Sequence, residues 1–489
     1  MSLTVLLAVA FVGAALYYVC PLRLRWVLLL LLSYGFYLTC GLSALPFIAL
    51  TTLTTWAGAL VIARVGESGK AYLRAHKAEL TAEAKKAQKA RTRSRQRVWF
   101  FAVLLLNFGV LAVLKYLNPV MAWGASLLGG SAPSLGLVLP LGISFYTFQS
   151  MGYLIDVYNG KYAPEKNPAK FALFVSFFPQ LIQGPIARFD QLESQLVTPH
   201  RFDLDGIERG LLLMLWGWFK KKVIADRALS LVEAVFGNQN AYGGAVIVVG
   251  VLFYSLQQYA DFSGGIDLVT GIAQLFGIQL APNFKRPYFS VSLGDFWRRW
   301  HISLGSWFRD YVYIPLGGSR VRLGRWVLNL LVVWGLTGLW HGAAWTFVLW
   351  GLYFAVFLLL EKLFLGRLLR RLPVLRHVYV LTAALFSFVL FDASSLSAAI
   401  GAAGAMLGLG HLPVWDGGTL YYLHSYAPVL LAAAVGSTPL PAVLCRRMAA
   451  GRAGRVLDAL EPIALLALLA VCTAFLVSGS ANPFLYFRF

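Results

Sequence analysis

Charged side chains are scarce in this chain. Only 13% of its 489 residues are Asp, Glu, Lys or Arg, whereas 59% are hydrophobic and 15% are aromatic. Soluble domains carry about 25% charged residues, so this composition excludes an ordinary soluble protein. Apolar runs long enough to cross a hydrocarbon core of about 30 Å recur along the whole chain. We expect an all-α polytopic membrane protein that forms a single domain over residues 1–489, with about ten to twelve crossings.

Cysteine is also rare, and its spacing indicates no metal site. The four cysteines show neither a CxxC pair nor a Cys/His ligand spacing, so we expect no disulfide framework. The chain further lacks a P-loop, HExxH, GxSxG, and a GxGxxG before a strand. ATP hydrolysis, zinc proteolysis and hydride transfer therefore have no support. We expect no metal ion and no tightly bound cofactor.

Acidic residues are few, and the basic residues are clustered. The chain has 42 Lys and Arg against 21 Asp and Glu, a net charge of +21. The clusters lie between apolar runs, which is the positive-inside pattern of cytoplasmic loops. We therefore expect contact with membrane lipids and no nucleic-acid binding, with recognition of a partner protein as the alternative. The clusters are Arg23 with Arg25, and residues 64–97, 220–222, 320–325, 367–376 and 446–455.

These clusters also predict a topology. The first apolar run, Leu3 to Val19, has no charged region before it and no cleavage signal after it, so it is expected to be a retained span. Counting spans from there places both chain termini on the extracytoplasmic side. Residues 64–97 contain no Pro and are expected to form a basic helical excursion on the cytoplasmic face. Further helices are expected over residues 326–340, 345–360, 377–391, 428–443 and 462–477.

Proline and glycine interrupt the apolar helices of the middle third. They occur at Pro140-Leu-Gly142, Pro179, Gly184-Pro185 and Gly264-Gly265. Broken helices survive at membrane depth only where protein or a water-filled cavity satisfies the freed backbone groups. A cavity or channel through the helix bundle is therefore expected.

Residues 285–318 contain an amphipathic pattern. Ser292-Leu-Gly-Asp295 resembles a capping box and predicts the start of a helix. From Asp295 to Tyr313 the large apolar residues follow steps of three and four, which predicts one interfacial helix. His301 on this helix is either a solvated interfacial side chain or a group at the cytoplasmic mouth of the cavity. The apolar positions are Trp297, Trp300, Leu304, Trp307 and Tyr311.

A second histidine lies inside an apolar hairpin. His341 is fifteen residues after Trp326, or about 22 Å along a helix, which places it deep in the membrane and nearer the outer face. Titratable groups at this depth are costly and usually serve a function. A neutral imidazole can accept a hydroxyl proton and return it to a leaving group. The alternative is a core histidine bonded to a backbone carbonyl, although the small residue Gly342 beside it favours the close approach of a ligand or of another backbone segment.

Other polar residues occur at membrane depth without a catalytic spacing. Asp261 and Asp267 are six residues apart, so they do not share a helix face and are not read as an acid/base pair. They are expected to bind arginines or helix N-termini, or to line the cavity. The candidates for lining a tunnel or positioning a ligand are Asp261, Ser263, Asp267, Gln149, Gln183 and Trp340.

Several segments, taken together, resemble the membrane-bound O-acyltransferase family. The likeness covers nearly the whole chain, and its motifs follow the family's order. Residues 391–397 and the ending, residues 484–489, are similar to the bacterial alginate O-acetyltransferase branch, which also acetylates peptidoglycan or cellulose. The five main motifs are residues 140–149, 178–186, 259–264, 296–304 and 336–342.

The resemblance implies a fold, a site and a location. The fold would be a ring of transmembrane helices, with interfacial and re-entrant helices, around a central tunnel in the bacterial inner membrane. His341 matches the family's catalytic histidine, and His301 matches a second functional histidine. Tyr486, in the C-terminal motif 482–489, is either a transient acyl acceptor or an aromatic interfacial anchor.

The resemblance also implies the reaction partners. The acyl donor would be acetyl-CoA or another acyl thioester, including one on a carrier protein. A separate extracytoplasmic acetyltransferase would complete the modification of a polysaccharide. Two other functions stay open: a D-alanyl transferase for teichoic acid, and an acyl or lipid transporter without catalysis.

Overall fold

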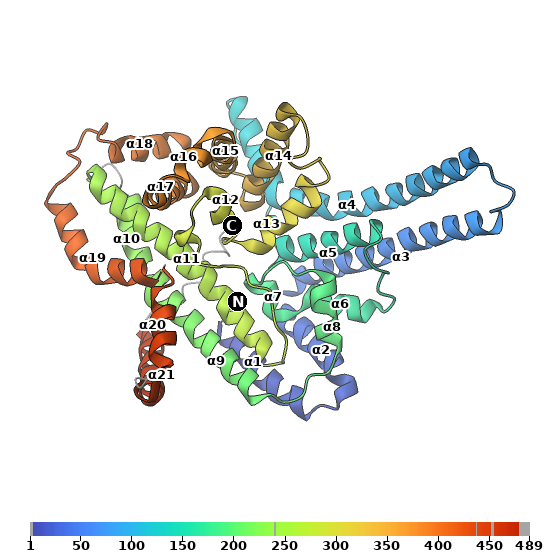
Figure 1. The fold of residues 1–489 in the computed structure, drawn as a ribbon, viewed down its shortest axis with the longest axis horizontal. Helices are drawn as coiled ribbons and strands as arrows, with labels where there is room; N and C mark the ends of the chain where they lie inside the picture. The colour runs from blue at the N-terminus through green and yellow to red at the C-terminus, as the bar shows by residue number, and fades with distance from the viewer. Residues whose placement is uncertain (1–2, 239–240, 437, 451–453, 479–489) are drawn as a thin grey trace. The chain divides into compact units, whose positions relative to one another are not determined.

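The computed structural model describes residues 3–238, 241–436, 438–450 and 454–478 (Figure 1). Helices are the only regular secondary structure in these ranges, so the all-α prediction is confirmed. The chain forms two compact units. The first contains Met1–Gly210 and Val269–Ala281, and the second contains Leu211–Leu268 and Pro282–Phe489.

Seven helical stretches of the described residues are long and apolar enough to cross a membrane, or eight if one bent pair counts as a single span. This number is below the ten to twelve expected. Helix α1 (Leu3–Val19) has 17 residues and α2 (Arg25–Leu38) has 14, whereas a straight crossing needs about 20. The seven are Leu42–Ala75, Ala82–Leu127, Gly244–Gln274, Leu323–His341, Trp345–Leu369, Pro373–Asp392 and Gly454–Phe475.

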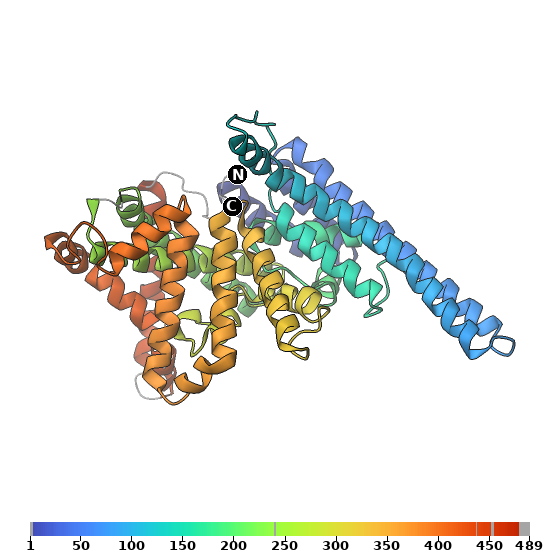
Figure 2. The same ribbon diagram turned by 90° about the horizontal axis from the view of Figure 1, so that it is seen from above.

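The first unit contains a long helical hairpin. Helices α3 (Leu45–Ala75) and α4 (Ala82–Leu127) run side by side, and the basic segment 64–97 forms the end of α3, the turn over residues 76–81 and the start of α4 (Figure 2). Thr81 begins α4 by accepting a hydrogen bond from the amide of Ala84 at 3.2 Å. The expected basic excursion is therefore helical. The remaining helices of this unit are α5 (Ile143–Tyr158), α6 (Pro168–Ser176), α7 (Phe178–Gln183), α8 (Phe189–Val197) and the start of α9 (Leu204–Phe219).

One basic residue of the first unit is not a loop residue. Arg25 is 7% exposed and donates hydrogen bonds to the backbone oxygens of Cys20 and Tyr18, at 3.2 and 3.0 Å, and of His200. Its guanidinium lies 4.9 Å from the ring centroid of Tyr17. The lipid contact expected of Arg25 is therefore wrong, because its charge joins separate segments of the unit, whereas the cytoplasmic side assigned to this cluster stays a prediction.

The predicted breaks at proline and glycine are correct in part. Gly142 precedes α5 with φ +71, where a Cβ would lie 2.5 Å from the oxygen of Leu181. Helix α7 ends before Gly184. The break predicted at Gly264 is wrong, because α11 (Gly244–Gln274) passes through it without interruption. The absence of a side chain instead lets α9 and α11 approach, since a Cβ on Gly264 would lie 2.8 Å from the oxygen of Gly217.

The second unit packs α14 (Leu323–His341), α15 (Trp345–Leu360) and α17 (Pro373–Asp392) side by side (Figure 2). These helices match the predictions. The helix expected over residues 428–443 is wrong, because Pro428 lies inside α19 and the chain bends by 72° before α20. The other helices are α10 (Asp226–Phe236), α12 (Leu293–Trp297), α13 (Ile302–Phe308), α16 (Gly366–Leu369), α18 (Leu396–Met406), α19 (Gly417–Gly436), α20 (Leu440–Ala449) and α21 (Gly454–Ser478).

Candidate active site

The helix predicted from Asp295 to Tyr313 is interrupted at His301. Helix α12 ends at Trp297, and α13 begins only after His301, whose backbone is left-handed at φ +46. The amides of Ile302 and Ser303 donate to the backbone and side-chain oxygens of Asn283, at 3.0 and 2.9 Å. These bonds replace the acceptors that a continuous helix would supply. The prediction was wrong because Asn283, far outside the repeating pattern, satisfies these amides.

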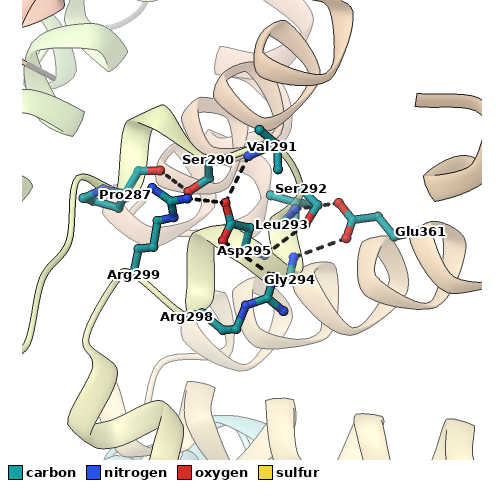
Figure 3. A network of polar contacts seen from close by, with 10 residues as sticks. All are labelled: Pro287, Ser290, Val291, Ser292, Leu293, Gly294, Asp295, Arg298, Arg299 and Glu361. Atoms are coloured by element: carbon teal, nitrogen blue, oxygen red, sulfur yellow. Dashed lines mark hydrogen bonds and ion pairs between the residues drawn. The ribbon is translucent and has the colours of Figure 1, made fainter. Parts of the chain in front are cut away.

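The start of α12 follows the predicted capping pattern. The hydroxyl of Ser292 accepts a hydrogen bond from the amide of Asp295 at 3.0 Å (Figure 3). The Asp295 carboxylate accepts from the amide of Val291 at 3.3 Å and forms an ion pair with Arg299 at 3.0 Å. Asp295 therefore orients both the approach to α12 and the residues just before His301.

The His301 side chain is buried and neutral. It is 2% exposed, which excludes the solvated interfacial position. The rings of Phe262 and Trp340 lie nearly perpendicular to it, with centroids at 4.8 and 5.5 Å. Neither ring nitrogen has a hydrogen-bond partner within the described part of the chain. Burial lowers the pKa of His301 to about 3, so the ring is uncharged near neutral pH and keeps one nitrogen lone pair as a hydrogen-bond acceptor.

His341 ends α14 within a cluster of aromatic rings. The rings of Trp350 and Phe391 lie 5.1 and 5.2 Å from its own. Trp340 contacts both histidines, at 5.5 Å from His301 and 5.0 Å from His341. One indole therefore links the two imidazoles that the sequence separates by forty positions.

Glycines set the position of this aromatic cluster. A Cβ on Gly338 would lie 2.3 Å from the oxygen of Phe347, so α14 and α15 can be this close only because the glycine lacks a side chain. A Cβ on Gly342 would lie 2.6 Å from the Phe347 ring. The Phe347 ring thus occupies the space beside Gly342, where the sequence had left open the approach of a ligand or of another backbone segment.

A cavity of about 940 Å³ opens in the second unit, and His301 lies in its wall. Trp334 and Thr337 of α14 contribute to the same wall. His341 is not among the described residues that line the cavity. Among the described residues that line the cavity, five are basic and one, Glu361, carries a carboxylate. The basic residues are Arg298, Arg309, Lys362, Arg370 and Arg376.

The two predicted aspartates pair with lysines. Lys221 contacts Asp261 at 2.5 Å, and Lys220 contacts Asp267 at 2.6 Å. Lys220 also donates to the hydroxyl of Ser263 at 3.3 Å. None of these five residues is among the described residues that line the cavity.

The lysine run 220–222 is therefore not a solvated loop. It forms a π-helical turn between α9 and α10, in which Lys221 and Lys222 are 5% and 7% exposed. Asp226 accepts from both of these lysines at 2.9 Å. The lipid contact expected of this cluster is wrong, because three lysines and three aspartates neutralise one another inside the unit, whereas the cytoplasmic side assigned to it stays a prediction.

The two predicted glutamines lie in the first unit. Gln149 donates to the backbone oxygen of Phe174 at 2.6 Å and accepts from Gln180 at 3.0 Å, so its amide joins α5, α6 and α7. Gln183 is fully buried, and neither of its amide atoms has a partner among the described residues. Tyr486 and the motif 482–489 lie outside the described residues.

Two residues that bind the segment around His301, Glu361 and Asn283, were not predicted from the sequence. Glu361 was detectable, since a single carboxylate that ends the apolar run of α15 is costly at membrane depth. Asn283 carried no such signal, because its role depends on contacts with Ile302 and Ser303, which lie 19 and 20 residues later.

Comparisons with known proteins agree with this architecture. The profile of the membrane-bound O-acyltransferase family matches residues 165–398. A "Probable alginate O-acetylase AlgI" of Azotobacter vinelandii is 35% identical over 412 residues, which cover 82% of this chain and 76% of that protein. The peptidoglycan O-acetyltransferase of Helicobacter pylori is 36% identical over 293 residues, or 55% and 56% of the two chains. The teichoic acid D-alanyltransferase of Streptococcus thermophilus is 29% identical over 244 residues, or 46% and 58%.

The helices and the relatives together define a polytopic membrane enzyme that transfers acyl groups. More particularly, the chain belongs to the membrane-bound O-acyltransferase family and is an O-acyltransferase.

Proposed function

We propose that this protein passes an acetyl group from a cytoplasmic thioester donor across the bacterial inner membrane, for O-acetylation of a cell-surface or secreted polysaccharide. One observation carries the proposal. The uncharged His301 ring, whose nitrogens have no hydrogen-bond partner among the described residues, lies in the wall of a large cavity lined by arginines and a lysine. The names of the relatives support acetyl as the acyl group and a polysaccharide as the acceptor.

The cavity suits a thioester that carries phosphates. Arg298, Arg309 and Lys362 are among its basic lining residues, and guanidinium and ammonium groups bind phosphate oxygens. Trp334 and Thr337 line the same cavity as His301 and add an apolar surface with one hydroxyl, and the thioester end would lie at His301. The donor class that fits is CoA or a phosphopantetheine-bearing carrier protein.

The two histidines can take different roles in the acyl transfer. In the transfer step an acceptor hydroxyl oxygen attacks the thioester carbonyl, its proton moves to a ring nitrogen of an imidazole, and the C–S bond breaks. The same proton then passes to the departing thiolate, so the imidazole returns to its starting state. We assign the base to His341 and the positioning of the donor carbonyl to His301. Trp340, which touches both rings, keeps their spacing.

The acceptor side involves the chain's C-terminal motif and a partner. The proposal places both termini outside the cytoplasm, where Tyr486 would receive the acetyl group as a phenolic ester. An extracytoplasmic acetyltransferase would then move it to the polymer. Intact-mass analysis of the C-terminal peptide during turnover tests this step. A gain of one acetyl group is expected, and no gain under turnover would contradict it.

The main experiment uses the purified protein in lipid nanodiscs with radiolabelled acetyl-CoA. Acyl transfer is measured as release of the free thiol and as label on the acceptor. His301→Ala and His341→Ala should each lower turnover by about 10²–10⁴-fold, the usual contribution of a positioned acid or base. His411→Ala is the matched control, because His411 is an exposed histidine of the same unit. Unchanged turnover in folded His341→Ala would overturn the enzyme mechanism and favour transport.

A second candidate function, D-alanyl transfer to teichoic acid, is supported by one of the relatives. The teichoic acid D-alanyltransferase relative shares 29% identity over less than half of this chain. Turnover of a D-alanyl carrier thioester, with none of acetyl-CoA, would replace the acetyl proposal with this one.

A further inference from the structure

We infer that Glu361 is a positioning residue that sets the geometry of His301. Its carboxylate comes from the end of α15, 60 positions after His301 in the sequence, yet it binds the segment that leads into this histidine. The inference rests on the proposed function, because it assigns Glu361 a role in the same acyl transfer.

The carboxylate holds the start of α12 with both oxygens. Oε1 accepts a hydrogen bond from the amide of Leu293 at 2.5 Å, and Oε2 accepts one from the amide of Gly294 at 3.2 Å (Figure 3). These are two of the amides that a helix cannot satisfy internally at its start. Ser292 satisfies the amide of Asp295. The first turn of α12 is therefore fastened to α15 by a two-point contact, which resists both translation and rotation.

The chain from α12 to His301 is short and rigid. Only Arg298, Arg299 and Trp300 separate the end of α12 from His301. The amide of Trp300 donates to Phe296 at 2.9 Å, and the Trp300 ring stacks on that of Phe296 at 5.6 Å. A displacement of α12 would therefore reach His301 without being absorbed by a flexible linker.

The other end of the segment is fixed independently. Asn283 is 1% exposed and accepts from Ile302 and Ser303, the two residues after His301. The amide of Lys285 donates a hydrogen bond to the backbone oxygen of Arg299, two residues before His301, at 2.9 Å. His301 is held between these contacts at φ +46 and ψ 52, a conformation rare for a side chain with a Cβ. Such a conformation persists only where the surroundings impose it on both sides.

Glu361 lies in the same cavity wall as His301, so a direct contact with the donor is the competing role. The two roles differ in what they change. A carboxylate that touches the donor alters KM for the donor, whereas a carboxylate that positions His301 alters kcat and the reactivity of the His301 ring.

The test compares Glu361→Gln and Glu361→Asp in the full-length protein in nanodiscs. Gln keeps the length but replaces one acceptor with an amide donor that faces a backbone N–H, and Asp is too short to reach both amides. Each should lower kcat by about ten- to a hundredfold with little change in KM, as expected from one unsatisfied buried amide. The Asn283→Ala variant should act in the same direction, because it releases the opposite end.

A chemical readout separates positioning from general loss of structure. Diethylpyrocarbonate modifies accessible neutral imidazoles, and the site is mapped by mass spectrometry. In the Glu361 variants the modification rate of His301 should change at least severalfold, while that of exposed His411 stays constant. Glu233→Gln, which changes an exposed carboxylate on α10 of the same unit, should move neither kcat nor the His301 rate.

The outcomes are distinct. Wild-type kcat and His301 reactivity in Glu361→Gln would overturn the inference. A raised KM with unchanged kcat and unchanged His301 reactivity would also overturn it and place Glu361 on the donor. Full activity in His301→Ala and His341→Ala would instead overturn the proposed function, whatever the Glu361 variants show.

Discussion

Two groups of buried titratable side chains lie in the second unit, and they are built in opposite ways. The lysines 220–222 are surrounded by carboxylates, with each ammonium within 2.9 Å of an aspartate oxygen. His301 is equally buried, yet neither of its ring nitrogens has a partner among the described residues. The cavity reaches His301 and not the lysines.

This difference distinguishes buried groups that stabilise the fold from a buried group that can react with a ligand. A buried charge must be paired, because an isolated charge in a low-dielectric interior is prohibitively costly. A buried imidazole can avoid that cost by staying neutral, which leaves a nitrogen available to a ligand. The lysine network holds helices together, and the histidine is kept for a reactant.

The largest expected effect concerns the lysine network. Lys221→Met leaves Asp261 without its 2.5 Å ammonium partner, so the free energy of unfolding should fall by about 3–5 kcal/mol. Chemical denaturation in detergent measures it. The double variant Lys221→Met with Asp261→Leu removes both charges and should recover most of the loss. A single variant as stable as wild type would show that the network does not hold the fold.

The second prediction concerns pH. The folded-state pKa of His301 is about 3, below the value of 6.5 for a free histidine. The unfolded chain therefore binds the proton first, and the folded state loses stability as the pH falls from 6.5 toward 3. Between pH 6.5 and 5 the loss should be about 2 kcal/mol from this group. Denaturation at both pH values measures it, and His301→Phe should lack this component.

His301→Phe also separates stability from activity at constant pH. Removing a buried polar group that has no hydrogen-bond partner in the described part of the chain should leave the free energy of unfolding unchanged or raise it by about 1 kcal/mol. Acyl transfer should nevertheless be lost. A strong destabilisation would mean that His301, like Lys221, is a structural residue.

The smallest effect is expected on the α3–α4 hairpin. Arg64, Arg91 and Arg95 are exposed basic residues of the segment 64–97. Changing any one to Ala should alter the free energy of unfolding by less than about 0.5 kcal/mol, the range for surface substitutions. Thermal unfolding of the three single variants checks this. A loss comparable with that of Lys221→Met would remove the contrast between solvated and buried basic clusters.

Local signals predicted the helices and much of the site. The apolar run of α15 gave its bounds, Trp345–Leu360, and Ser292 marked the start of α12 through its spacing to Asp295. The order of the motifs predicted the family. These features depend on residues close to one another in the sequence.

Features that depend on distant partners were not predictable. Lys221 reads as a loop residue until Asp261, forty positions later, is seen beside it. The helix through His301 looked continuous because nothing in its periodicity reveals Asn283 as a competing acceptor. Glu361 was overlooked because its targets are backbone amides, which every sequence contains.

The most direct test of the central claim is whether an acyl donor occupies the space beside His301. Modification of His301 by diethylpyrocarbonate is measured at pH 7 with and without acetyl-CoA, with exposed His411 as the internal reference. Because the His301 ring is 2% exposed, the account predicts slow modification of it through the cavity in the free protein. The donor should suppress this modification in a saturable way, while the modification of His411 stays the same. Equal modification of His301 with and without a donor that is turned over would contradict it.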